Sequence, residues 1–146
     1  MLAVLLLVGL LPLALAGTLL SRRSAEALRA IEILVAEATR DAALQKQLEA
    51  GLAKLLAGDA AFEVKRFACK QLAVIGTDAS LPAIAGLLNH EATAGIACLA
   101  LSTQPSAKAG EALRNALSTA RGSAQLQIIN TLGNRKDAKA VSAISN

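Results

Sequence analysis

Apolar residues recur along this chain at intervals of three and four positions, the spacing that places them on one face of an α-helix. The first block of this kind carries Ala25, Leu28, Ile31, Leu34, Val35 and Ala38. Later blocks cover residues 44–55 and 64–75, and shorter ones follow toward the end of the chain. The pattern predicts about seven to eight short helices beyond residue 16, with antiparallel neighbours and no strand of three or more residues.

Glycine and proline mark the expected ends of these helices. Gly58 and Gly76 directly follow two apolar blocks, and glycine readily adopts the left-handed conformation that often closes a helix. Asp78 or Ser80 can then cap the next helix, with Pro82 in its first turn, where the missing amide hydrogen is harmless. We therefore expect a helix on either side of a tight turn.

This arrangement of two unlike helices repeats along the chain. Its first helix is represented by AGLAKLL at 50–56, PAIAGLL at 82–88, EALRNAL at 111–117 and SAI at 142–144. Its second helix is represented by FACKQL at 67–72, IACLAL at 96–101 and QIINTL at 127–132. The starting points 50, 82, 111 and 142 of the first helix give offsets of 32, 29 and 31 residues. A pair of about 30 residues has too little volume to bury its own apolar stripe, so the pairs must stack.

Two segments carry a resemblance to a known family, LAVIGTDASLPAIAGLL at 72–88 and LGNRKDAKAVSAI at 132–144. In each, an Ile-Gly or Leu-Gly helix end meets a turn that contains aspartate and then an alanine-rich helix. The chain resembles the short bacterial HEAT-repeat proteins described as phycobilisome-lyase HEAT-like repeats. This resemblance implies an all-α fold over residues 42–146, a right-handed α-solenoid of stacked antiparallel helix pairs with a period of about 30 residues and an incomplete last repeat.

The sequence departs from the repeat pattern at two points. The segment LALSTQPSAKAGEAL at 99–113 has neither aspartate nor a glycine directly after its leucine, which predicts a longer or kinked connection. Val141 and Ile144 have no following repeat to stack on, so we expect a fragment of a longer protein, or an end that is mobile or dimerises. Tetratricopeptide repeats are the nearest rival architecture, but their aromatic positions are empty here.

Composition agrees with closely packed helices. The 146 residues include 33 Ala and 27 Leu, with two Phe and no Trp or Tyr, and alanine lets neighbouring helices approach closely. The formal net charge of +4 is spread without any run of five like charges, which is typical of a solvated surface and not of a nucleic-acid footprint. Basic residues gather only at Arg135, Lys136 and Lys139, where Asp137 interrupts them.

The N-terminus has the pattern of a targeting segment. Residues 1–16 are mostly apolar and end in Ala14-x-Ala16, the small-residue pattern that precedes a signal peptidase cut. This predicts an exported protein, periplasmic or secreted. Residues 2–20 are also uncharged and long enough to span a bilayer, so a membrane anchor and a misplaced start methionine stay open as alternatives. We expect residues 17–41 to form an N-terminal capping helix.

The sequence contains few residues that could carry chemistry. His90 is the single histidine, and we expect it in a loop between helices, so neither a catalytic triad nor a metal site is indicated. Cys69 and Cys98 occupy matching repeat positions, which lie about 8 to 10 Å apart on stacked helices, too far for a disulfide. We expect both to be buried thiols. We therefore expect no enzyme activity, no cofactor and no metal.

The second helix of each pair is expected to line the concave side of the solenoid, over Val64–Ile75, Ala92–Thr103 and Ser123–Leu132. The predicted partner-binding residues are Lys65, Arg66 and Lys70 on the first of these helices, and Gln125 and Asn130 on the third, beside Leu126. The middle helix is expected to expose Ala94, Gly95 and Leu99. This surface is basic at one end and amide-rich at the other, which suits an extended or acidic protein segment.

The leading functional hypothesis is a non-catalytic protein-protein interaction scaffold whose partner is another protein or another domain of a longer chain. A HEAT-like module that supports an enzyme or redox domain stays open as an alternative, because phycobilisome-lyase repeats take part in chromophore attachment. Nucleic-acid binding through the basic C-terminal residues is a third alternative, which export would disfavour.

Overall fold

The computed structural model describes residues 22–141, with side chains from residue 25 onward. Within this range the chain forms seven α-helices and no strand. They are α2 (Arg22–Ala38), α3 (Ala42–Ala57), α4 (Phe62–Ile75), α5 (Leu81–Ala85), α6 (Glu91–Thr103), α7 (Ala107–Leu117) and α8 (Gly122–Asn134). The prediction of an all-helical fold is confirmed for this part of the chain. The expected leader at 1–16, the alternative anchor at 2–20 and the repeat segment at 142–144 lie outside the described residues.

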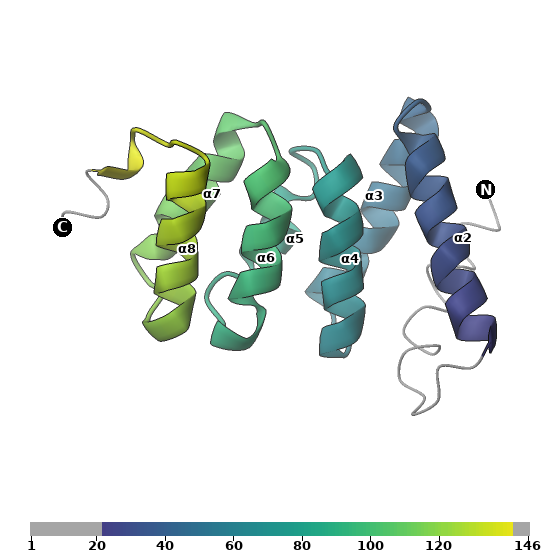
Figure 1. Ribbon diagram of the computed structural model, residues 1–146, viewed down its shortest axis with the longest axis horizontal. Coiled ribbons are helices and arrows are strands. Elements are labelled where there is room, and N and C mark those ends of the chain that lie inside the picture. The colour runs from purple at the N-terminus through teal and green to yellow at the C-terminus, as the bar shows by residue number, and fades with distance from the viewer. Residues whose placement is uncertain (1–21, 142–146) are drawn as a thin grey trace.

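The helices alternate between two rows (Figure 1). In the first row α2 packs against α4, α4 against α6 and α6 against α8, while in the second row α3 packs against α5 and α5 against α7. The two rows also pack on each other, through α3 with α4, α5 with α6 and α7 with α8. The predicted second helices of each pair correspond to α4, α6 and α8, with boundaries that agree to within two residues.

The apolar core lies between the two rows. The last residues of the three aligned second-helix segments, Leu72, Leu101 and Leu132, are 0%, 0% and 1% exposed. Alanine fills many of the contacts between helices, and the fully buried examples are Ala68, Ala94, Ala97, Ala100, Ala109 and Ala124. The high alanine content therefore serves close approach of the helix backbones.

Cys69 and Cys98 lie in this core, on the adjacent helices α4 and α6. Both are buried and neither forms a disulfide, as predicted. Burial raises the pKa of the Cys69 thiol to about 12. Burial also raises the pKa of Cys98, while a hydrogen bond with Thr131 acts in the opposite direction. Desolvation disfavours the thiolate because the charged form loses its hydration.

The predicted conformation of two helix-ending glycines is wrong. Gly58 and Gly76 do occupy the C-cap positions of α3 and α4, but their φ angles are −96° and −63°, outside the left-handed region. The structure indicates a different reason for glycine at position 76. A Cβ there would meet the Leu72 carbonyl oxygen and would lie 2.5 Å from Nε2 of Gln104. Within residues 22–141 the left-handed residues are Lys136, at φ 52°, and Gly122, at φ 57°.

The turn before α5 is held from another helix. Ser80 occupies the N-cap position, but its side chain makes no capping hydrogen bond. The buried carboxylate of Glu49, on α3, instead accepts hydrogen bonds from the backbone N–H groups of Thr77 at 2.6 Å and Ser80 at 3.1 Å. Asp78 is exposed and pairs with Lys108 of α7 at 3.0 Å. Hydrogen bonds from Ser106 and Lys108 lower the pKa of the Asp78 carboxyl.

The connection between α6 and α7 is short, which contradicts the prediction of a longer or kinked one. It comprises residues 104–106, three positions, against five at 76–80 between α4 and α5. The Ser106 side chain accepts a hydrogen bond from the Lys108 N–H at 3.2 Å and so caps α7. Arg135 donates from Nη1 to the carbonyl oxygens of Leu101 and Gln104, both at 2.5 Å, and from Nη2 to that of Ser106 at 2.9 Å. Arg135 thus holds this connection, as Glu49 holds the turn before α5.

Leu72→Ala and Leu101→Ala should each lower the free energy of unfolding by about 2 to 5 kcal/mol, because each deletes a fully buried side chain between the two rows. Chemical denaturation followed by circular dichroism measures the loss. A change below about 0.5 kcal/mol at both positions, the size expected of surface substitutions, would contradict the packing described.

Gly122→Ala and Gly133→Ala should change stability in opposite directions. At position 122 the φ angle of 57° strains any L-residue, so we expect a loss of about 1 to 2 kcal/mol. Position 133 lies within α8, and a Cβ there would meet nothing within 4 Å, so we expect a gain of about 0.5 to 1 kcal/mol. Thermal melts of the two variants provide the comparison, and equal shifts would refute it.

The native thiols should react with a maleimide or aromatic disulfide at pH 8 only when the protein unfolds. A thiol with a pKa of about 12 has on the order of one thiolate in ten thousand at this pH.

Because the folded-state pKa of Cys69 is raised, the unfolding free energy should fall as pH rises above about 8.5, where the unfolded thiol begins to ionise. A native mass lower by two hydrogens under non-reducing conditions, or reaction without denaturant, would contradict the structure.

Candidate functional site

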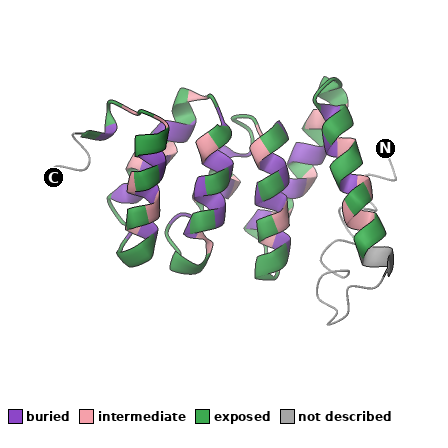
Figure 2. Ribbon diagram, in the orientation of Figure 1, coloured by how far each residue is buried: buried purple, intermediate pink, exposed green. Residues whose placement is uncertain are grey.

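Each of the helices α4, α6 and α8 exposes one line of residues spaced three or four positions apart. These residues are Glu63, Arg66, Lys70 and Val74 on α4, Ala92, Gly95, Leu99 and Thr103 on α6, and Ser123, Leu126, Asn130 and Asn134 on α8. We call this surface the outer face. Figure 2 shows it as exposed bands on the side of these helices that is turned away from the second row.

Two contacts give the relative heights of the helices on the outer face. The Thr103 hydroxyl donates a hydrogen bond to the carbonyl oxygen of Ala73 at 2.8 Å, so the end of α6 lies level with Val74. A Cβ on Gly95 would lie 2.6 Å from Oε1 of Gln127, so Gly95 lies level with that part of α8. The exposed residues therefore form three parallel lines in register.

An apolar diagonal crosses the outer face. Val74 on α4 is 61% exposed, Leu99 on α6 is 52% exposed and Leu126 on α8 is 64% exposed. From α4 to α6 to α8, each of these residues lies about one helical turn nearer the N-terminal end of its helix than the one before it. Sequence reasoning had placed Leu99 and Leu126 on this surface but had overlooked Val74. The exposed position of Val74 follows from the spacing of four residues after Lys70.

The structure brings the predicted partner-binding residues onto one surface, with two differences in exposure. Arg66, Lys70 and Asn130 are exposed on the outer face, while Lys65 and Gln125 are half-buried. Among the residues expected on the middle helix, Gly95 and Leu99 are exposed, but Ala94 is fully buried, so its prediction is wrong. The reason is that α6 packs against both α4 and α8, which narrows its exposed strip.

The basic residues of α4 have acidic partners within the chain. Arg66 donates to Glu63 from Nε at 2.9 Å and from Nη2 at 2.6 Å, and Lys70 lies 3.7 Å from Glu32 of α2. Exposed ion pairs of this kind add little stability, but they offset the positive charge that the sequence had suggested for this end of the face. The Lys70 pair was missed because its acidic member lies 38 residues earlier.

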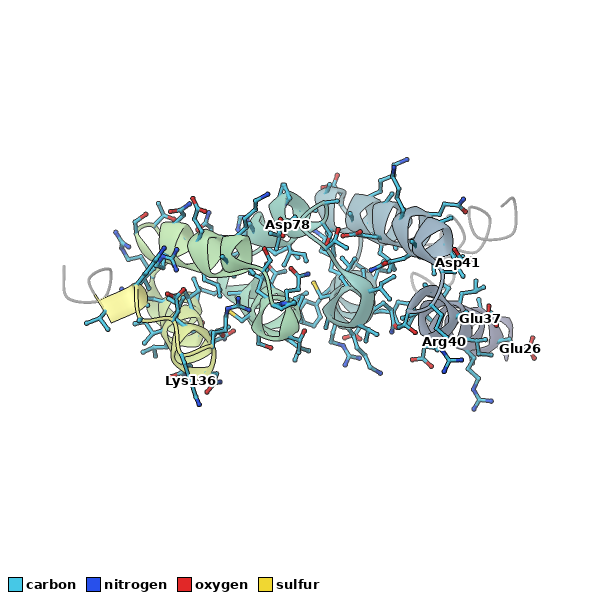
Figure 3. All side chains as sticks on the ribbon, turned by 90° about the horizontal axis from the view of Figure 1, so that it is seen from above. Glu26, Glu37, Arg40, Asp41, Asp78 and Lys136 are labelled. Atoms are coloured by element: carbon cyan, nitrogen blue, oxygen red, sulfur yellow. The ribbon has the colours of Figure 1, made fainter. Side chains whose placement is uncertain are left out.

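The basic C-terminal cluster has a structural role. It surrounds a hollow of about 330 Å³ whose charged lining includes Arg114, Arg135, Lys136 and Asp137. Arg114 pairs with Asp137, whose side chain is only 12% exposed, and Arg135 is bonded to three carbonyl oxygens. In Figure 3 the Lys136 side chain points away from the stack. Arg114 and Arg135 are thus held in contacts within the chain.

Few groups on the described residues could take part in catalysis or metal binding. His90 is exposed at the N-cap of α6 and makes no capping hydrogen bond through its side chain. Between residues 22 and 141 no group of three or more His, Cys, Asp or Glu side chains is placed to hold a metal ion. No helix in this range is both long enough and apolar enough to cross a bilayer.

Comparisons of this chain with protein-family models, with curated proteins and with solved structures found no match.

Proposed function

We propose that this chain is a non-catalytic protein-binding scaffold, built as a right-handed α-solenoid of HEAT-like helix pairs with a period of about 30 residues. Its partner lies across the outer face of α4, α6 and α8. Export through a leader at residues 1–16 is part of the proposal, so the partner is an extracytoplasmic protein or another domain of a longer chain.

Support for the repeat comes from positions that are equivalent along the chain. Leu72, Leu101 and Leu132 are separated by 29 and 31 residues and are all fully buried. The helices that carry them are neighbours in one row, and each exposes the same four positions on its outer side. A repeat with this period accounts for both the shared burial and the shared exposure.

The apolar diagonal is the observation that carries the proposed binding function. Val74, Leu99 and Leu126 are each more than half exposed, on three adjacent helices. Removing apolar surface from water contributes about 25 cal/mol per Å² to binding. Exposed apolar residues that are rimmed by polar ones are typical of protein interaction sites. Because Arg66 and Lys70 already have acidic partners, the partner should meet this face mainly through apolar side chains.

Site-specific photo-crosslinking tests the proposed face. A photo-crosslinking amino acid at position 99 or 126 should capture the same partner in cells that produce the full chain. The control places it at position 115, an exposed residue of α7 in the second row. Capture of one species from positions 99 and 126 and none from 115 is expected, whereas equal capture from all three or none from the outer face would refute the proposal.

Substitution of the diagonal provides a quantitative test once that species is identified. Leu99→Gln with Leu126→Gln should weaken binding at least about tenfold, because two exposed apolar contacts are lost. The melting temperature should change little, since both residues are more than half exposed. Ile33→Gln, an equally exposed apolar residue on α2, is the matched control.

A further inference from the structure

We infer that Lys136 is a further partner-binding residue of the outer face and meets an acidic side chain of the partner protein, an inference that rests on the proposed scaffold function. Lys136 follows α8, directly after the C-cap residue Arg135. It adds one charged contact to a face that otherwise offers its partner the apolar diagonal.

The end of α8 has the hydrogen bonds of a Schellman turn, a common way to close a helix. The backbone N–H of Lys136 donates to the carbonyl oxygen of Gly133 at 2.9 Å, and that of Asp137 donates to the carbonyl oxygen of Leu132 at 3.1 Å. This turn places Lys136 at the position that takes a left-handed backbone, and its φ angle is 52°. Glycine is the usual residue there.

Lysine is a costly residue at this position. A Cβ is crowded by the neighbouring carbonyl oxygen in the left-handed conformation, whereas glycine adopts this conformation freely. Between residues 22 and 141 the other left-handed residue is Gly122, so Lys136 alone carries a side chain in that conformation. Because glycine would close the helix at a lower cost, the turn itself does not explain the lysine, and the reason lies in its side chain.

The Lys136 side chain lies on the side of α8 that belongs to the outer face. In Figure 3 it extends from the end of α8 away from the stack, on the side of the first row that is turned away from the second row. Lys136 is exposed, and its ammonium group forms no ion pair with the described residues.

The charge of Lys136 is not offset within the chain. The two basic residues of α4 on the outer face already have acidic partners, and α8 contains no charged residue. The neighbours Arg135 and Asp137 are held in contacts within the chain. A partner that approaches this end of the face therefore meets an unpaired cation, which an acidic side chain complements. Opposite charges at the rim of an interface favour the correct orientation and fast association more than they add affinity.

The spacing along α8 gives the position of the acidic residue in the partner. Positions 126 and 136 are ten residues apart, which corresponds to about 15 Å along a helix. The partner should therefore place an apolar residue on Leu126 and an acidic residue about 15 Å away, beyond the C-terminal end of α8.

Charge reversal in the full chain tests this contact, with capture by a photo-crosslinking amino acid at position 126 as the readout. Lys136→Glu should lower the yield of the captured species about tenfold at low salt, because an attractive contact becomes repulsive. The difference should shrink at about 1 M salt, which screens exposed charges. Lys54→Glu is the matched control, since Lys54 is exposed on α3 in the second row and the net charge changes equally.

A stability measurement tests the inference without a partner. Lys136→Gly should raise the melting temperature by about 2 to 5 °C, because glycine relieves the left-handed conformation. The same substitution should lower capture at position 126. An unchanged or lower melting temperature would overturn the inference, since the turn itself would then favour lysine.

The two proposals fail in different ways. Equal capture by the Lys136→Glu and Lys54→Glu chains would overturn the role of Lys136 and leave the scaffold function intact. Absence of capture from the outer face of the otherwise unsubstituted chain would refute the scaffold function, and the role of Lys136 with it.

Discussion

Packing between neighbouring helices of the first row is the constraint on which the rest of the structure depends. α6 buries residues on nearly all sides because it contacts α4, α8 and the second row. Beyond its first residue, Glu91, only one line of four residues remains exposed on it. The width of the outer face, the burial of Ala94 and the isolation of Leu99 in the middle of that face all follow from this packing. A helix with fewer neighbours would expose a broader and less regular surface.

Polar contacts between neighbouring helix pairs then fix the connections. Glu49 holds the turn before α5 through two backbone N–H groups, and Arg135 holds the connection before α7 through three carbonyl oxygens. Buried polar groups are costly unless they are paired. Each of these side chains satisfies helix-end groups that would otherwise lose their contact with water. The connections are thereby positioned by the neighbouring pair and not by their own sequence alone.

The sequence predicted the helices and their common buried position because both depend on local periodicity. Leu72, Leu101 and Leu132 could be aligned by spacing, and their burial agrees with that alignment. The sequence did not predict the contacts that are formed by residues far apart along the chain. Lys70 pairs with Glu32, and the turn at Ser80 is held by Glu49, across 38 and 31 residues.

Glycine at position 76 avoids a clash of a Cβ with the Leu72 carbonyl oxygen and with the Gln104 side chain, and the second of these contacts was invisible in the sequence. The same limit applies to the candidate site. Periodicity identified most of the exposed positions, but it counted Ala94 as exposed because one helix seen alone does not reveal that it is packed on both sides.

Hydrogen bonds between neighbouring helix pairs join residues 28 to 34 positions apart, from Thr77 with Glu49 to Arg135 with Leu101. A chain connected in this way behaves as a series of linked elastic elements, because each pair transmits force only to the next. Bending at each contact can be small while the two ends move far. The outer face can therefore change its curvature without loss of any helix.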